Sequence, residues 1–451
     1  MAAAYDLTPR MAPFLDAHLL LPLLDSLKEL KIYDGDAVLK QKINVITKTN
    51  MVDSALEQME EVADPKAKAE YATQKAALEE RSAKILNEFD AEPEDIKVVV
   101  EFFKNESLVQ KLKSGSNLEI EFLSANHGIN AEALNKYYKR GKFEYECGQY
   151  NEAEVILANF LSVQQPTSSY VQGAQWGILA CHLLTSKSDK TLSDFSAVKY
   201  SIESRGVAPL DQIRLRAWFL HWGLFVHTNR PDGVDALADL FTEKQYLQTM
   251  ENLCPWLLRY YTAAVILSPS RRRNMLRDVL NEIQNFSYLY SDPITQFLES
   301  LYTQFDFDKA QLKLKECQEL IKQDFFLQHF LDRFTEEARI LICEMYCTIN
   351  KNVDLTMLAG KLQLTVEEAE KFMVNMIRGS AAGNGAQLDA KIDSSEKKVL
   401  MALLQKTPQE QVMEKTRDLT GRSNSLSQVL DSVVSDSSDY LKARNGAAKY
   451  F

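Results

Sequence analysis

The chain contains the stretch DLTMLAGKLQLTVEEAEKFMVNMIR from Asp354 to Arg378, followed by LDAKID from Leu388 to Asp393. The first stretch predicts two helices separated by a turn, because its apolar residues recur at helical spacing. In the second stretch apolar and charged residues alternate, as they do in a half-buried strand. This region therefore combines helices with at least one strand.

A hairpin completes the region. Residues 397–403 follow a Ser-Ser-Glu turn and predict a second strand that pairs with the first. The order helix, helix, helix, hairpin predicts a winged helix over residues 334–403. The alternating apolar residues of the first strand are candidate interface positions, and its edge is a candidate for pairing with a partner protein. These positions are Leu388, Ala390 and Ile392.

Upstream of the winged helix, successive segments with apolar residues at helical spacing extend from Tyr5 to about Asn350. Two of them, over 137–160 and 302–320, are similar to the helix–turn–helix of tetratricopeptide repeats, whose units bury their apolar faces by stacking. No strict repeat period occurs. The fold class that we predict is mainly α: an irregular, right-handed helical-repeat solenoid followed by the winged helix and a C-terminal helix.

The domain boundaries follow from these patterns. They are an N-terminal helical region over 1–130, helical repeats over 131–333, the winged helix, a C-terminal bundle helix over 404–435 and a disordered tail over 436–451.

Apolar residues recur every seven positions along the C-terminal helix, which places them on one seam. They are Val412, Leu419, Leu426 and Val433. The supporting positions Thr416 and Ser423 are polar, so the seam is weak alone. We expect it to join a multi-subunit helical bundle, and the four residues are candidate interface positions.

The net charge of −11 argues against autonomous nucleic-acid binding, because acidic surfaces repel phosphate backbones. The third helix of the winged helix also opens with acidic residues, the wrong sign for a DNA-reading helix. A basic cluster, Arg271, Arg272 and Arg273, is a candidate contact with RNA or the ribosome, although such clusters more often form a solvated surface.

Catalytic and metal-binding motifs are missing from the sequence. No phosphate-binding glycine loop and no metal-ligand spacing of histidines occur. Cys343 and Cys347 share a helix face, which favours core packing over a zinc site, and Asp306 and Asp308 favour helix capping over paired-carboxylate chemistry. The sequence predicts a protein that is not an enzyme and has no cofactor and no small-molecule substrate.

The apolar run Leu19–Leu24 is too short for a membrane span and has no basic segment before it, so we predict neither a signal peptide nor a membrane contact. The six scattered cysteines contain no CxxC pair and predict buried thiols in a reducing compartment. We therefore expect a cytosolic chain, with access to the nucleus left open.

A solenoid that ends in a winged helix resembles the PCI domain, which is shared by subunits of the proteasome lid, the COP9 signalosome and a translation initiation factor. Within that family the sequence is similar to the E subunits of eukaryotic translation initiation factor 3, over residues 5 to about 430. The resemblance rests on the order and spacing of YDLTPRMAPFLDAHL (Tyr5–Leu19), NMVD (Asn50–Asp53), KFEYECGQY (Lys142–Tyr150), DPITQFLESLYTQFDFDKAQ (Asp292–Gln311), QDFF (Gln323–Phe326) and LDAKID. The loop Gly379–Ala386 is longer than in the family.

This resemblance implies a non-catalytic scaffold that binds other subunits of the initiation factor through its winged helix and C-terminal helix. It also implies docking of the complex on the small (40S) ribosomal subunit, which promotes pre-initiation complex assembly and mRNA recruitment, with mRNA contacted indirectly. Two alternatives stay open: a subunit of the proteasome lid or signalosome, and a winged-helix regulator that binds nucleic acid.

Overall fold

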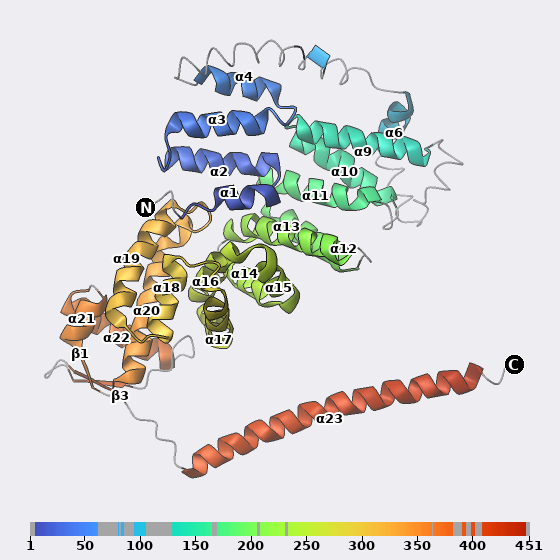
Figure 1. Cartoon of the computed structure of the whole chain (residues 1–451). Helices are drawn as coiled ribbons and strands as arrows, with labels where there is room; N and C mark the ends of the chain where they lie inside the picture. Colours follow the sequence, from blue (N-terminus) through green and yellow to red (C-terminus); the bar gives the residue numbers. More distant parts are fainter. Residues whose placement is uncertain are drawn as a thin grey trace. The chain divides into compact units, whose positions relative to one another are not determined.

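The computed structural model describes the chain over residues 5–61, 80, 83–84, 94–104, 129–164, 169–204, 208–230, 233–350, 352–362, 364–381, 390–393, 398–401 and 408–447. Most of these residues are helical (Figure 1). The chain divides into two compact units. The first comprises Met1–Tyr346 with Ala359–Thr365, and the second comprises Cys347–Leu358 with Val366–Phe451.

Helices that pack on their sequence neighbours build the first unit (Figure 1). The N-terminal ones are α1 (Thr8–Met11), η2 (Ala12–Phe14), α2 (Ala17–Glu29), α3 (Gly35–Ile46), α4 (Val52–Glu61) and α6 (Glu94–Lys104). The middle ones are α9 (Ala131–Glu146), α10 (Tyr150–Val163), α11 (Ser169–Leu184), α12 (Ser188–Ser204), α13 (Pro209–Thr228), α14 (Gly233–Thr242) and α15 (Lys244–Leu253). The later ones are η3 (Pro255–Leu257), α16 (Leu258–Leu267), α17 (Pro269–Phe286), α18 (Pro293–Tyr302), α19 (Phe307–Gln323), η4 (Gln328–Phe330) and α20 (Leu331–Ile349), which ends in the second unit.

The predicted turn between α9 and α10 shows how the sequence makes a repeat. Gly148 has a φ of 87°, a left-handed conformation that favours glycine, and it lets the chain reverse between the two helices. Ala153 is fully buried, and a Cβ at Gly141 would lie 2.7 Å from Ile156. Small residues therefore set the close packing of α9 on α10.

The same logic appears between α18 and α19. Asp292 caps α18 in a capping box with Thr295, and Pro293 occupies the first turn, where its missing N–H costs nothing. Asp306 caps α19 by accepting hydrogen bonds from the backbone N–H groups of Asp308 and Lys309 at 3.1 and 3.0 Å. The sequence-based interpretation of this acidic pair as a cap is confirmed.

The second unit contains the small sheet. Its strands are β1 (Asn352–Asp354), β2 (Ala390–Asp393) and β3 (Lys398–Met401), in the antiparallel order β1-β3-β2. Val353 and Ile392 both pair with Val399 from opposite sides. Val353 and Val399 are fully buried, so this apolar row fixes the register of all three strands.

Helices α21 (Leu355–Leu362) and α22 (Val366–Ala381) lie between β1 and β2 in the chain. The helical solenoid with a winged helix is confirmed, and so is the hairpin over β2 and β3. The strand β1 is a difference from the sequence-based prediction, in which Asp354 began a helix. Three residues are too few for an alternating pattern to be recognised.

The last helix, α23 (Pro408–Ala447), is longer than the sequence predicted. We expected a helix over 404–435 and a disordered tail over 436–451, whereas α23 continues to Ala447. Of the predicted tail, residues 448–451 lie outside the described residues. Its side chains are exposed from Gln411 to Val434. The domain boundaries otherwise remain predictions.

Candidate protein interface

The seam of α23 is an exposed apolar surface. Val412, Leu419, Leu426 and Val433 are 63, 65, 64 and 57% exposed. A helix with exposed apolar side chains gains little from folding alone and gains more when another surface covers that stripe. The structure thus places the four predicted residues on one helix with their side chains in solvent.

Four further apolar residues of α23 are exposed and were not singled out from the sequence. They are Met413, Val429, Leu430 and Val434. Leu430 follows Val412 by 18 residues, or five turns, and therefore lies in line with it on the helix. The spacing of four residues between Leu426 and Leu430 could have identified this denser C-terminal half.

Strand β2 is the second predicted interface element. It lies at one end of the sheet and pairs with β3 along its other side. Ala390 and Ile392 are partly buried, whereas Lys391 between them is exposed. Leu388 lies outside the described residues. An edge strand offers backbone N–H and C=O groups to another strand, as the sequence analysis expected.

One member of the arginine cluster, Arg272, differs from its expected role. Arg272 is only 5% exposed and its Nη1 donates to Oε2 of Glu337 at 3.0 Å. Arg271 forms an ion pair with Asp239 on α14. The position of Arg273 in the sequence is known, but its side chain is outside the described set. Arg272 therefore links its own helix, α17, to Glu337 on α20. Its side chain does not face solvent, which corrects the prediction that Arg272 contacts RNA or the ribosome.

A buried charge cluster that sequence reasoning missed surrounds Arg259 on α16. Its Nε donates to Asp292 at 2.9 Å, its Nη1 donates to Asp324 at 3.1 Å, and its Nη2 donates to the carbonyl oxygen of Tyr5 at 2.8 Å. Tyr260 donates its hydroxyl to Asp324 at 3.1 Å. Residues separated by up to 254 positions thus meet at one side chain.

The electrostatics keep this cluster in one protonation state. Burial opposes the charge of Arg259, but Tyr290, Asp292 and Asp324 outweigh it, so the pKa of the guanidinium lies well above its ordinary value. Burial, with Asp324 nearby, raises the pKa of Tyr260 well above its ordinary value. A charged arginine and a neutral phenol therefore persist together, which suits a structural hydrogen-bond network.

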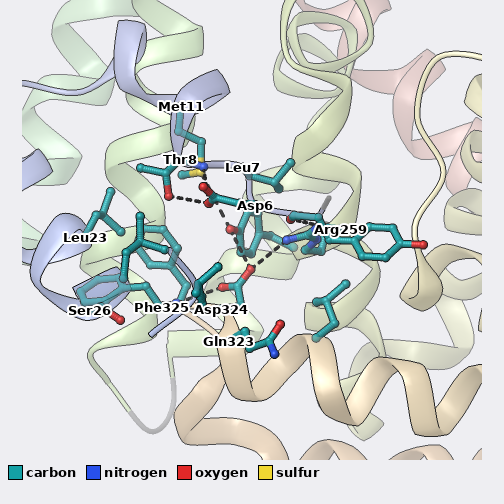
Figure 2. A pocket seen from close by; sticks show the side chains of 16 residues that line it. Asp6, Leu7, Thr8, Met11, Leu23, Ser26, Arg259, Gln323, Asp324 and Phe325 are labelled. Carbon is teal, nitrogen blue, oxygen red and sulfur yellow. Dashed lines mark hydrogen bonds and ion pairs between the residues drawn. The ribbon is translucent and has the colours of Figure 1, made fainter. Parts of the chain in front are cut away.

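A small cavity lies beside this cluster, between the N-terminal segment and α19 (Figure 2). Its volume of about 40 Å³ holds about one water molecule. Figure 2 shows Arg259 and Asp324 facing each other at this cavity, with Asp6 and Thr8 above them. The cavity has no room for a substrate, and its polar groups join the N-terminal segment to α16 and α19.

Other contacts fasten the same segment to the solenoid. The ring of Phe14 stacks on His221 with a centroid distance of 4.6 Å. Tyr145 donates its hydroxyl to Asp16 at 2.6 Å, and the backbone N–H of Asn50 donates to the carbonyl of Glu146 at 3.1 Å. The N-terminal region is therefore built into the first unit.

The described residues contain no group of three or more histidine, cysteine, aspartate or glutamate side chains that could hold a metal ion. All six cysteines are free thiols, and Cys343 and Cys347 are buried, as predicted. Across the part of the chain that the structure describes, no helix has both the length and the apolar character needed to cross a membrane.

Comparison with known proteins identifies two family domains. The eIF3 subunit 6 N terminal domain matches residues 6–144, and the PCI domain matches residues 314–402. Asp324 lies in the second match and Asp6 in the first, so the two matched regions meet beside Arg259.

Curated relatives match along nearly the whole chain. The sequence is 36% identical to the E subunit of eukaryotic translation initiation factor 3 from Yarrowia lipolytica, over 95% of this chain and 99% of the relative. It is 35% identical to the proteins of the same name from Brugia malayi and Arabidopsis thaliana. These matches cover 96% and 94% of this chain, and 96% and 95% of the relatives.

Proposed function

The chain belongs to the family of E subunits of eukaryotic translation initiation factor 3, and from this premise we propose that it is a non-catalytic scaffold of that factor. The observation that supports this role most directly is the exposed seam of α23. A scaffold that binds through protein interfaces needs apolar side chains that its own fold leaves in solvent. The α23 seam meets that need.

The proposal has two contact elements. The α23 seam joins a helical bundle with other subunits, and the edge of β2 pairs with a strand of a neighbouring PCI subunit. Through the assembled factor, the chain contributes to binding the small ribosomal subunit and recruiting mRNA. Its place of action is the cytoplasm, where initiation occurs.

Two alternatives are less well supported. A role in the proteasome lid or the signalosome would keep the PCI fold, but the relatives named above are initiation-factor subunits. A nucleic-acid regulator would need a basic recognition helix, whereas the first turn of α22 carries Glu367 and Glu368. The net charge of −11 also opposes phosphate binding.

The test is a double substitution in the seam, Leu419→Asp with Leu426→Asp, in the tagged full-length protein. Affinity purification with mass spectrometry and a sucrose gradient should recover the other initiation-factor subunits with the unmodified chain and lose them with the variant. A buried aspartate in a bundle core would remain unpaired and costly. If the unmodified chain instead recovered subunits of the proteasome lid or the signalosome, its assignment to the initiation factor would be wrong.

The matched control is Asn424→Asp with Gln428→Asp, which adds the same charges on the face of α23 opposite the seam. This variant should co-purify with the factor as the unmodified chain does. If the seam variant also retained its partners, the bundle would be excluded as the contact.

A further inference from the structure

A pocket lined by aromatic rings opens in the first unit, away from α23 and β2 in the sequence. Its volume is about 220 Å³, below the range of typical small-molecule sites. The lining side chains on which its chemistry depends are Asp16, Tyr138, Tyr145, Trp176, Trp218 and Trp222, which we call the aromatic pocket. Its size suits one large side chain.

Trp176 lies nearly perpendicular to two other indole rings of the pocket. Trp176 on α11 meets Trp222 of α13 with a centroid distance of 4.7 Å and an interplanar angle of 78°. It also meets Trp218 at 6.2 Å and 81°. Perpendicular rings present one face and one edge to the same space, so a planar group that stacks on one indole meets the other edge-on. Trp218 is 37% exposed, which leaves the pocket open to solvent.

A carboxylate lies in the lining. Oδ2 of Asp16 accepts hydrogen bonds from the hydroxyl of Tyr145 at 2.6 Å and from the backbone N–H of His18 at 3.2 Å. Both of these hydrogen bonds use Oδ2, and the second carboxylate oxygen, Oδ1, takes part in neither. Burial, with Asp16 nearby, raises the pKa of Tyr145 well above its ordinary value, which keeps this phenol a donor and Asp16 an acceptor.

Two tryptophans of the lining carry hydrogen-bond donors that lack acceptors. The indole N–H groups of Trp176 and Trp222 are buried, and neither has a hydrogen-bond partner among the described residues. Trp222 itself is only 2% exposed. A buried donor without an acceptor is costly, and a carbonyl group carried by an incoming peptide would relieve that cost after a small ring movement.

The one cation in the lining is directed elsewhere. Lys142 is exposed, and its Nζ lies 3.8 Å from Glu146. The described cation–π contacts, Arg140 with Phe143 and Lys199 with Tyr246, use other rings. The aromatic faces of the pocket and Asp16 therefore form a receptor for a cation that the described part of the chain does not fill.

We propose that the aromatic pocket binds an arginine side chain on an extended segment of a neighbouring protein subunit. Arginine fits because its flat guanidinium stacks on indole and its N–H groups match a carboxylate. Nucleic acid does not fit, because the rim carboxylate and the net charge of −11 repel phosphate. The identity of the partner as an initiation-factor subunit rests on the proposed function, whereas the arginine specificity does not.

Tryptophan fluorescence reports on this pocket, since three of the four tryptophans line it. The probe is a blocked five-residue peptide with a single arginine between glycines, titrated into the full-length chain. Saturable quenching is expected. A peptide with citrulline, the neutral isostere, should bind roughly tenfold more weakly because it lacks the cation. Equal binding of the two peptides, or no saturable change, overturns the proposal.

Two variants change the charge at the pocket and distinguish an effect on arginine binding from an effect on folding. Asp16→Asn keeps a residue that caps α2 and accepts from Tyr145, and it should weaken arginine binding by roughly tenfold. Lys142→Met, which removes the nearby positive charge, should leave binding unchanged or strengthen it. Unchanged binding by Asp16→Asn, or weaker binding by Lys142→Met, overturns the proposal.

The outcomes are independent of membership in the complex. A chain that co-purifies with the initiation factor but ignores the arginine peptide would refute the pocket and leave the proposed function intact. A chain that binds the peptide but recovers no factor subunits would support the pocket and refute the proposed function.

Discussion

Around Arg259, charged groups brought inside the first unit meet one another, whereas along α23 apolar groups lie in solvent. Arg259 and Asp324 are nearly fully buried, at 2% and 8% exposed, and each has several hydrogen-bond partners. Leu419 and Leu426 are 65 and 64% exposed. The first region completes its contacts within the chain, and the second requires another surface. Stability and assembly should therefore respond to different substitutions.

The largest effect on stability is expected from Arg259→Ala. Removing the guanidinium leaves Asp292 and Asp324 buried without their cation, which costs about 3–5 kcal/mol of unfolding free energy. Urea unfolding followed by circular dichroism measures this loss. A loss below about 1 kcal/mol would show that the cluster does not hold the N-terminal segment.

A second effect should depend on pH. Nδ1–H of His221 donates to the carbonyl of Ala217 at 2.7 Å, and its Nε2 accepts from the indole of Trp256 at 3.1 Å. Burial lowers the pKa of His221 to about 4, below its ordinary value of 6.5. The unfolded chain therefore binds a proton first, so stability should fall as the pH drops from 6.5 to 4, by up to about 3 kcal/mol.

The measurement is the midpoint of urea unfolding between pH 7 and 4 for the unmodified chain and for His221→Gln. The substitution should reduce the pH dependence without abolishing it, because burial also lowers the pKa of His227 to about 4. The control His329→Gln, at an exposed histidine, should leave the profile unchanged. An identical pH profile in the His221 variant would contradict the assignment.

The smallest effect should come from a surface ion pair. Arg271 and Asp239 are each 42% exposed in their side chains, and such pairs contribute about 0–1 kcal/mol. Arg271→Ala should therefore change the urea midpoint little compared with Arg259→Ala. A loss as large as that of Arg259→Ala would erase the distinction between the buried and exposed pairs.

The α23 seam could be predicted from the sequence because a helix seam is a local pattern: one residue every seven. The solenoid and the hairpin were predicted for the same reason. The Arg259 cluster could not be, since it joins Tyr5, Asp292 and Asp324 across long separations. Asp292 and Asp324 lie in stretches that carried the family resemblance, yet no spacing rule links them.

The arginine triplet shows the opposite failure. Its local pattern indicated a basic surface, but burial of Arg272 against Glu337 depends on α20, which lies 65 residues away. The aromatic pocket likewise combines rings from α9, α11 and α13 with the residue that caps α2, so none of its rings stood out in the sequence. Local periodicity predicts elements, while side-chain partners require the packed structure.

Hydrogen exchange measured by mass spectrometry, on the isolated chain and on the chain in its complex, tests the central claim most directly. The account predicts that amides over 412–433 gain strong protection on assembly, because partners cover the seam. Amides of α16 and α18, around Arg259 and Asp292, should be protected equally in both samples. Equal protection of α23 in both samples, or gain of protection around Arg259 instead, would contradict it.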